Sequence, residues 1–350
     1  MALQTPLHDA HAALGATFTP FAGYDMPVVY GSINDEHRTV REAVGLFDVS
    51  HMSNLFVEGP GAADTIAAVT TRPVALPVGK GQYGVLLHAD GTILDDVFTF
   101  RLEEERFLMI PNAGRNDAVA QHLAGHAVGE VLVADETRDW AILALQGPKA
   151  RPLLGEIAEG EAPKFHHITT MTLAGVECLV SGTGYTGEKG VELYVPADGA
   201  RAVWDALMAA GEAHGIKPIG LGARDTLRLE KGYALAGNEF AGGRTPLEAG
   251  LDWLVDWKHE FLGKGALVRQ RSSDHDRLWG LTQEKGVPRG GYDVLVDGRR
   301  LGSITSGTKS PTTGTGIALA YLKDVQEGDE VAVDVRGRAQ DAVVVKPPFV

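Results

Sequence analysis

Apolar residues in the first part of the chain switch several times between helical and extended spacing. The helix expected at 34–45 opens with Asn34 as N-cap and acidic first-turn residues, and Gly45 ends it. The turn at 89–92 contains Asp-Gly and predicts a hairpin. Together these patterns predict an α+β unit at about 50–138. The other expected helices are 8–15, 60–72 and 114–124, and extended segments are expected at 46–59, 83–88, 93–101 and 106–111.

The second part of the chain has a similar rhythm and then changes character. A polar stretch at 270–276 indicates a linker. Beyond it, residues 277–345 form short alternating runs separated by glycine-rich turns, which is typical of a small β-barrel or sandwich. The sequence therefore predicts two α+β units followed by a β unit. The elements expected before the linker are strands at 140–146, near 169–181 and at 190–195, and helices at 149–157, 198–214, 221–231 and 263–269.

Composition narrows the class of protein. The chain has 350 residues, enough for a sizeable core, and a formal net charge of −14. This acidic balance argues against a nucleic-acid partner, because such proteins carry a basic patch or stripe. The N-terminal residues contain no basic segment followed by a long apolar stretch, and no run approaches a membrane span. We expect a cytoplasmic protein with no membrane partner.

Cysteine and histidine usage gives no sign of a metal centre. The one cysteine, Cys178, rules out a disulfide framework and a cysteine-rich metal site. It lies in the apolar run 176–180, which favours a buried strand residue over a nucleophile. The pair His166-His167 is not part of an H-E-x-x-H motif, so we predict no metal ligands.

The glycine-rich segment 182–187 matches the pattern of a dinucleotide-binding loop but lacks its context. That loop must open a helix, whereas an alternating strand follows here at 190–195. A phosphate-binding P-loop fails as well, because Glu188 occupies the position that lysine needs. We interpret the segment as a hairpin turn.

Several charged residues could serve a site or only the fold. Strand alternation places Glu192 opposite Val191 and Leu193, either as a solvated residue or as an acceptor for a ring N–H and an amino group, such as those of a pterin. Alternation also sends Asp95 and Asp96 to opposite sides, so at most one points into a given site; a structural role is the other interpretation.

The helix expected at 221–231 carries two arginines on one face. Arg224 and Arg228 are four residues apart, with Asp225 and Glu230 available for ion pairs. A surface ion-pair helix and a cation placed for an anionic group both remain open. The sequence contains no nucleophile-elbow motif, so its motifs do not indicate a hydrolase. The residues alone indicate an acidic cytosolic α+β enzyme or binding protein.

Many short segments, in order and nearly from end to end, resemble the glycine cleavage T-protein (aminomethyltransferase) family. This number of ordered matches makes the resemblance specific. The matching segments are Thr5-Pro6-Leu7-His8, Phe21-Ala22-Gly23-Tyr24-Asp25-Met26-Pro27, Asp35-Glu36-His37, Gly45-Leu46-Phe47-Asp48-Val49-Ser50-His51-Met52, Gly91-Thr92-Ile93-Leu94-Asp95-Asp96, Gly184-Tyr185-Thr186-Gly187-Glu188, Gly220-Leu221-Gly222-Ala223-Arg224-Asp225, Ile304-Thr305-Ser306-Gly307-Thr308 and Lys346-Pro347-Pro348-Phe349-Val350.

The resemblance implies an α+β fold of three domains arranged like a cloverleaf. It divides the chain into a discontinuous folate-binding domain at 1–49 and 139–270, a second α+β domain at 50–138 that contributes the catalytic aspartate, and a β-barrel domain at 277–350. The implied reaction moves a methylene group from the aminomethyl-lipoyl arm of a partner, the H-protein, to the co-substrate tetrahydrofolate. Ammonia is released and 5,10-methylenetetrahydrofolate forms, with no metal required.

The resemblance also implies roles for individual residues. Asp95 matches the carboxylate near the folate nitrogens and is expected to orient N10 and stabilise the methylene as ammonia leaves. Asp96 is expected to point away. Two alternatives are a folate-dependent demethylase and a non-catalytic folate-binding protein of the same fold; the presence of both Asp95 and Glu192 favours an enzyme. The expected folate-binding residues are Met52, Tyr83, Asn112, Tyr185, Glu192 and Arg224.

Overall fold

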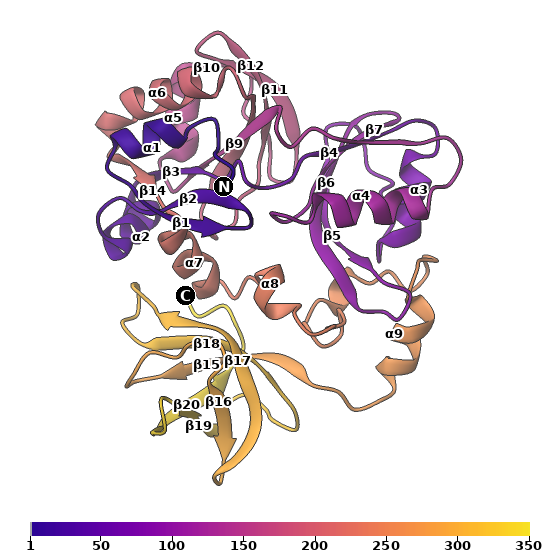
Figure 1. The fold of residues 1–350 in the computed structure, drawn as a ribbon, viewed down its shortest axis with the longest axis vertical. Helices are drawn as coiled ribbons and strands as arrows, with labels where there is room; N and C mark the ends of the chain where they lie inside the picture. Colours follow the sequence, from indigo (N-terminus) through magenta and orange to yellow (C-terminus); the bar gives the residue numbers. More distant parts are fainter. Residues whose placement is uncertain (1) are drawn as a thin grey trace. The chain divides into compact units, whose positions relative to one another are not determined.

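A computed structural model describes residues 2–350 and divides them into two compact units. The first unit contains the residues up to Gly84 together with Asp95–Arg224, and the second contains Val85–Leu94 and Asp225–Val350. Each unit therefore combines segments that are far apart in the sequence (Figure 1). The domain limits expected from the sequence stay a prediction.

The larger sheet of the first unit has seven strands and brings together the two ends of that unit's sequence. β14 pairs with β3 in parallel, whereas β3, β9, β13, β12, β11 and β10 pair antiparallel in succession. The strands are, in sheet order, β10 (Ala158–Glu159), β11 (Ile168–Leu173), β12 (Val176–Ser181), β13 (Gly190–Pro196), β9 (Trp140–Gln146), β3 (Val44–Asp48) and β14 (Ile216–Ile219).

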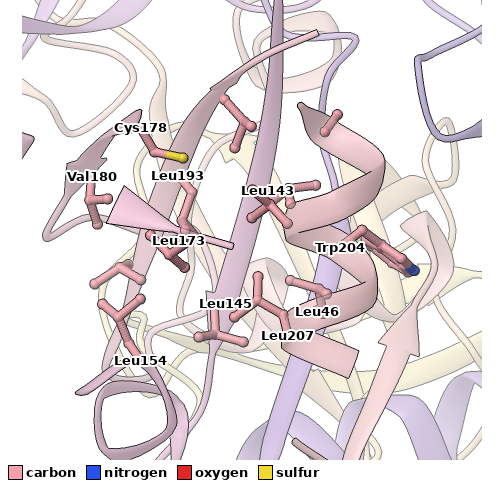
Figure 2. Packing of buried hydrophobic residues seen from close by; sticks show 14 of the residues in the cluster. Leu46, Leu143, Leu145, Leu154, Leu173, Cys178, Val180, Leu193, Trp204 and Leu207 are labelled. Atoms are coloured by element: carbon pink, nitrogen blue, oxygen red, sulfur yellow. The ribbon is translucent and has the colours of Figure 1, made fainter. Parts of the chain in front are cut away.

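One face of this sheet is buried by helices and forms a hydrophobic core. Figure 2 shows Trp204 and Leu207 of α6 (Ala200–Gly211) packed among leucine side chains of the strands, with the sulfur of Cys178 in the same cluster. Cys178 is 1% exposed, which confirms the prediction of a buried strand residue. Helices α1 (His8–Ala13) and α5 (Ala150–Ile157) contribute to this core, and α2 (Ile33–Glu42) contacts β3 and β14.

A second sheet follows in the order β5-β6-β7-β4-β8, and the residues of strands β5 and β6 are divided between the two units. Its strands are β5 (Gly81–Leu87), β6 (Ile93–Glu103), β7 (Arg106–Ile110), β4 (Leu55–Glu58) and β8 (Leu132–Asp135). Helices α3 (Ala62–Val69) and α4 (Asn116–Gly125) accompany it, and β1 (Thr17–Phe21) pairs with β2 (Tyr24–Val29) as a separate hairpin.

The C-terminal part of the second unit is a closed barrel. Its strands alternate inward apolar residues, so that Leu281, Val294, Val333 and Val344 share one core. The predictions of an α+β fold and of a C-terminal β-barrel are confirmed. The barrel order is β15 (Arg277–Gln283), β18 (Gly316–Leu322), β17 (Arg299–Lys309), β16 (Asp293–Val296), β19 (Glu330–Asp334) and β20 (Ala339–Val345), preceded by α7 (Leu221–Glu230), α8 (Ala236–Glu239), η2 (Asp252–Leu254) and α9 (Lys264–Arg271).

The predicted limits of α2 are wrong at both ends. Its N-cap is Ser32 rather than Asn34, since the Ser32 hydroxyl accepts from the Asp35 N–H at 3.4 Å. Gly45 does not end the helix but lies in β3, where an added Cβ would stand 2.5 Å from Ile219 Cγ1. Glycine is needed here because the Ile219 side chain packs closely against the strand. The sequence pattern alone does not distinguish such a glycine from one that ends a helix.

Other predictions differ less. The single extended region near 169–181 is two strands, β11 and β12, which turn at 174–175. The glycine-rich segment 182–187 connects β12 to β13 and opens no helix, as predicted. Short strands β1, β2, β8, β10 and β14 were not predicted. No helix within residues 2–350 is long and apolar enough to cross a membrane.

Candidate active site

The two neighbouring aspartates of β6, Asp95 and Asp96, form one hydrogen-bond network with two other residues of the first unit. Asn112, which follows β7, donates from Nδ2 to Asp95 Oδ1 at 2.9 Å and to Asp96 Oδ1 at 2.7 Å. Its backbone N–H donates to Asp95 Oδ2 at 2.9 Å. The Tyr83 hydroxyl of β5 donates to Asp96 Oδ2 at 2.7 Å. Tyr83, Asp95 and Asn112 thus lie together. This is consistent with the expectation from the sequence that all three belong to one site.

The expectation that Asp96 points away from this group is wrong. Alternation separates the two side chains at the strand, but Asn112 lies alongside Asp96 and also donates to its carbonyl oxygen at 3.0 Å. From that position a single amide nitrogen reaches both carboxylates. Asp96 therefore belongs to the same polar group as Asp95, and it joins that group to Tyr83.

The two carboxyl groups differ in exposure, and the pKa of Asp95 is shifted. Asp95 is 0% exposed, and burial together with the negative charge of Asp96 raises its pKa to about 7, although hydrogen bonds from Asn112 and the charge of Arg115 oppose the shift. Asp96 is half-buried. A bound molecule can thus approach Asp96, while Asp95 is enclosed by protein.

A second polar group lies on the face of the seven-stranded sheet opposite the helix-covered core. Glu192 of β13 points away from the core that its neighbours Val191 and Leu193 enter, as strand alternation predicted. Glu192 Oε2 accepts a hydrogen bond from the Thr183 hydroxyl at 2.5 Å. The carboxylate is half-buried and is available to a ligand with N–H groups.

Arg224 of α7 belongs to this second group. Its Cζ lies 4.8 Å from the centroid of the Tyr185 ring, a cation–π distance. Burial lowers the pKa of Arg224, and the charges of Glu192 and Tyr185 counteract the shift. The atom Nη1 is buried and has no hydrogen-bond partner among residues 2–350. An unpaired guanidinium N–H beside a carboxylate is typical of a site that receives a polar ligand.

His51 was not predicted as a site residue but lies near Arg224. It is 3% exposed, and burial and the Arg224 charge lower its pKa to about 4, against the opposing charge of Asp48. Its Nδ1 is also buried without a partner in the described chain. No spacing signal marks this residue in the sequence. Met52, the neighbouring residue, is half-buried in the turn after β3, where its N–H donates to the Val49 carbonyl at 3.0 Å.

The two polar groups adjoin within the first unit. Burial raises the pKa of Tyr83 well above its ordinary value, with further contributions from Asp96, then Tyr185 and then Asp95. Tyr83 of the first group and Tyr185 of the second are therefore electrostatic neighbours. The seven predicted residues and the two added by the structure, Asp96 and His51, all belong to this unit.

Arg228 differs from Arg224 despite sharing a helix with it. It is 1% exposed and pairs with Asp225 at 2.7 Å and with Glu239 at 3.1 Å. The interpretation of a surface ion-pair helix is wrong for this residue, because its guanidinium is buried together with the Glu239 carboxylate, although Asp225 is exposed. Arg228 has a structural role in the second unit.

The arrangement supports two kinds of chemistry. Glu192 and Arg224 offer an acceptor and a donor to a planar ring that carries N–H groups and an oxygen. Asp96 can orient or stabilise a group that becomes positively charged. Within residues 2–350, no group of three or more His, Cys, Asp or Glu side chains is placed to hold a metal ion.

Comparison with known proteins gives matches along the whole chain. The family model "GCVT N-terminal domain" matches residues 7–259, and "Glycine cleavage T-protein C-terminal barrel domain" matches residues 277–350. An aminomethyltransferase of Symbiobacterium thermophilum is 44% identical, covering 99% of this chain and 96% of that protein. One from Halothermothrix orenii is 42% identical and covers 99% of both.

A solved structure agrees with these sequence matches. The glycine cleavage system aminomethyltransferase T from Bartonella henselae superposes with a TM-score of 0.93 at 33% identity, covering 100% of this chain and 98% of that one. The fold, the site and these full-length relatives define an enzyme of the transferase class. Within that class, the chain belongs to the glycine cleavage T-protein family, that of the aminomethyltransferases.

Proposed function

We propose that this chain transfers the methylene carbon of an aminomethyl group from the lipoyl arm of a carrier, the H-protein, to tetrahydrofolate. The carbon–sulfur and carbon–nitrogen bonds of the aminomethyl thioether break, and two new carbon–nitrogen bonds form to the folate. The nitrogen leaves as ammonia, and the two protons displaced from the folate nitrogens go to ammonia and to the lipoyl thiol. Atoms balance without an oxidant.

The observation that carries this proposal is the pair of adjoining polar groups in a member of an aminomethyltransferase family. Glu192 would accept from the ring N–H and amino groups of the pterin, and Arg224, stacked on Tyr185, would hold the same ring. Binding the ring rigidly brings its nitrogens to the methylene carbon, which is a proximity effect. Met52 would supply an apolar contact in the same pocket.

We assign the carboxylate that faces the reacting nitrogens to Asp96 rather than to Asp95. Asp96 is half-buried and oriented by Tyr83 and Asn112, whereas both oxygens of the enclosed Asp95 accept from Asn112. Asp96 would orient N10 and stabilise the positive charge that develops as ammonia leaves. Asp95 would act as a positioning residue that holds Asn112.

Two isosteric variants test this assignment with aminomethyl-loaded H-protein and tetrahydrofolate. Asp96→Asn should lower kcat by roughly 10²–10³-fold with a small change in KM, the size of effect typical of a lost catalytic acid–base or electrostatic group. Asp95→Asn should lower kcat by about tenfold, because Asn112 loses one of its two acceptor oxygens on residue 95 while the carboxylate of residue 96 stays in place.

A larger loss of kcat in Asp95→Asn than in Asp96→Asn would show that Asp95 is the catalytic carboxylate. Tetrahydrofolate binding without any aminomethyl transfer by the wild type would instead favour a demethylase or a non-catalytic folate protein. Ammonia release and methylenetetrahydrofolate formation are measured in the same reaction, so the two conclusions are separable.

A further inference from the structure

His51 and Arg224 reach the same place because of the sheet topology. β3 and β14 are the parallel pair of the seven-stranded sheet, with Phe47 opposite Ile219, so their carboxyl ends lie at one edge. His51 lies in the turn that follows β3, and Arg224 lies in the first part of α7, which follows β14. The residues that follow these two strands therefore lie close together.

Glu192 faces the same region from the middle of the sheet. It is opposite Ala144 of β9, and Ala144 is opposite Phe47 of β3, so the three residues form one row across the sheet. Residues of one row project from the same face. The carboxylate, the guanidinium and the imidazole are thus supplied by three different elements of one unit.

Two buried nitrogen atoms of this group have no hydrogen-bond partner in the described chain. His51 Nδ1 and Arg224 Nη1 are both buried, and neither has a hydrogen-bond partner among residues 2–350. Buried polar atoms without partners are uncommon in folded proteins and are costly unless a ligand or solvent satisfies them. Burial and the neighbouring Arg224 charge lower the pKa of His51, so its imidazole is neutral and carries one N–H.

We propose that His51 is a specificity residue that, with Arg224, donates to one acceptor oxygen on the ring of the bound molecule. Glu192 accepts from the N–H groups at the adjacent ring positions. A carbonyl oxygen accepts two hydrogen bonds, which matches one guanidinium N–H and one imidazole N–H. This pattern selects a ring with a lactam edge, and it rests on the proposed function in that the ring is the pterin of tetrahydrofolate.

The test compares tetrahydrofolate with its 4-amino-4-deoxy analogue, in which an amino donor replaces the ring oxygen. Titration calorimetry under reducing conditions gives both dissociation constants for the full-length chain. The wild type should prefer tetrahydrofolate by about tenfold or more, since the analogue places a donor against donors. His51→Ala should bind tetrahydrofolate about tenfold more weakly and the analogue almost unchanged, so the preference falls.

Two further variants separate specificity from folding. His51→Gln keeps a side-chain N–H and should recover part of the preference, and it carries the test if His51→Ala does not fold. His11→Ala removes a different buried histidine of the same unit, which contacts Asp48 at 2.9 Å and Tyr30 at 2.8 Å. This control should lower the melting temperature and leave the preference intact.

A full preference for tetrahydrofolate in His51→Ala would overturn the inference while leaving the proposed function in place. Failure of the wild type to bind tetrahydrofolate would contradict the proposed function itself, together with the identity of the ring. A preference lost in His51→Ala and partly restored in His51→Gln supports the assignment.

Discussion

Asp95 shows how the surroundings of one residue set its ionisation. Burial and the charge of Asp96 hold its pKa at about 7, against an ordinary value of 3.8. Folding therefore favours the protonated form, and the associated stability is complete below pH 3.8 and is lost as the pH rises through about 7. An enclosed carboxyl group of this kind reduces the stability of the fold in neutral solution.

The expected consequence is a pH-dependent effect of Asp95→Asn on the free energy of unfolding. Asparagine does not titrate, so the variant gains stability relative to the wild type between about pH 4 and pH 7, at up to about 1.4 kcal/mol per pH unit, and the difference is level above pH 8. Urea unfolding at several pH values measures this difference. A difference that stays constant from pH 4 to pH 8 would contradict the raised pKa.

At the scale of secondary structure, Glu36 joins the elements that carry the site. It lies on α2, is 3% exposed, and accepts from the backbone N–H groups of Tyr30 at 2.7 Å, Gly31 at 3.2 Å and Gly220 at 2.8 Å. Gly220 directly precedes α7, the helix of Arg224. One carboxylate thus fixes the segment after β2 and the start of α7.

Glu36→Gln should weaken this junction. The amide replaces one acceptor oxygen by a donor that meets a backbone N–H, which leaves a buried hydrogen bond unmade and costs about 1–3 kcal/mol of unfolding free energy. Tetrahydrofolate binding should weaken in parallel, because the start of the Arg224 helix is released. Glu42→Gln, an exposed position at the end of α2, is the matched control and should change stability by less than about 0.5 kcal/mol. Equal stability of the two variants would refute this role of Glu36.

Helices and strands could be predicted where the pattern of apolar residues along the segment itself specifies them. The core helix of Trp204 and the alternation around Glu192 follow from periodicity, and the structure agrees. β14 was missed because a four-residue strand between two helices has little periodicity, and its pairing with β3 depends on tertiary contacts. The prediction that Asp96 points away was wrong for the same reason, since alternation within β6 says nothing about Asn112, which lies in the segment after β7.

At the scale of the whole molecule, the second unit has an ionic centre of its own. Arg228 of α7 pairs with Asp225 at 2.7 Å and with Glu239 of α8 at 3.1 Å, and it donates to the Ser306 hydroxyl of β17 at 2.9 Å. Arg228 is 1% exposed and Glu239 is 0% exposed. One guanidinium therefore connects two helices to the barrel inside a single unit.

Removing this guanidinium should destabilise the second unit selectively. Arg228→Met leaves the buried Glu239 carboxylate without its cation, which typically costs about 3–5 kcal/mol. In differential scanning calorimetry, the second unit should unfold at a lower temperature in this variant than in the wild type. The double variant Arg228→Met/Glu239→Gln removes the uncompensated charge as well and should recover part of the lost stability, because neutral side chains cost less to bury than an unpaired ion. A double variant that is no more stable than Arg228→Met would show that the loss comes from packing and from the bond to Ser306 rather than from the buried charge.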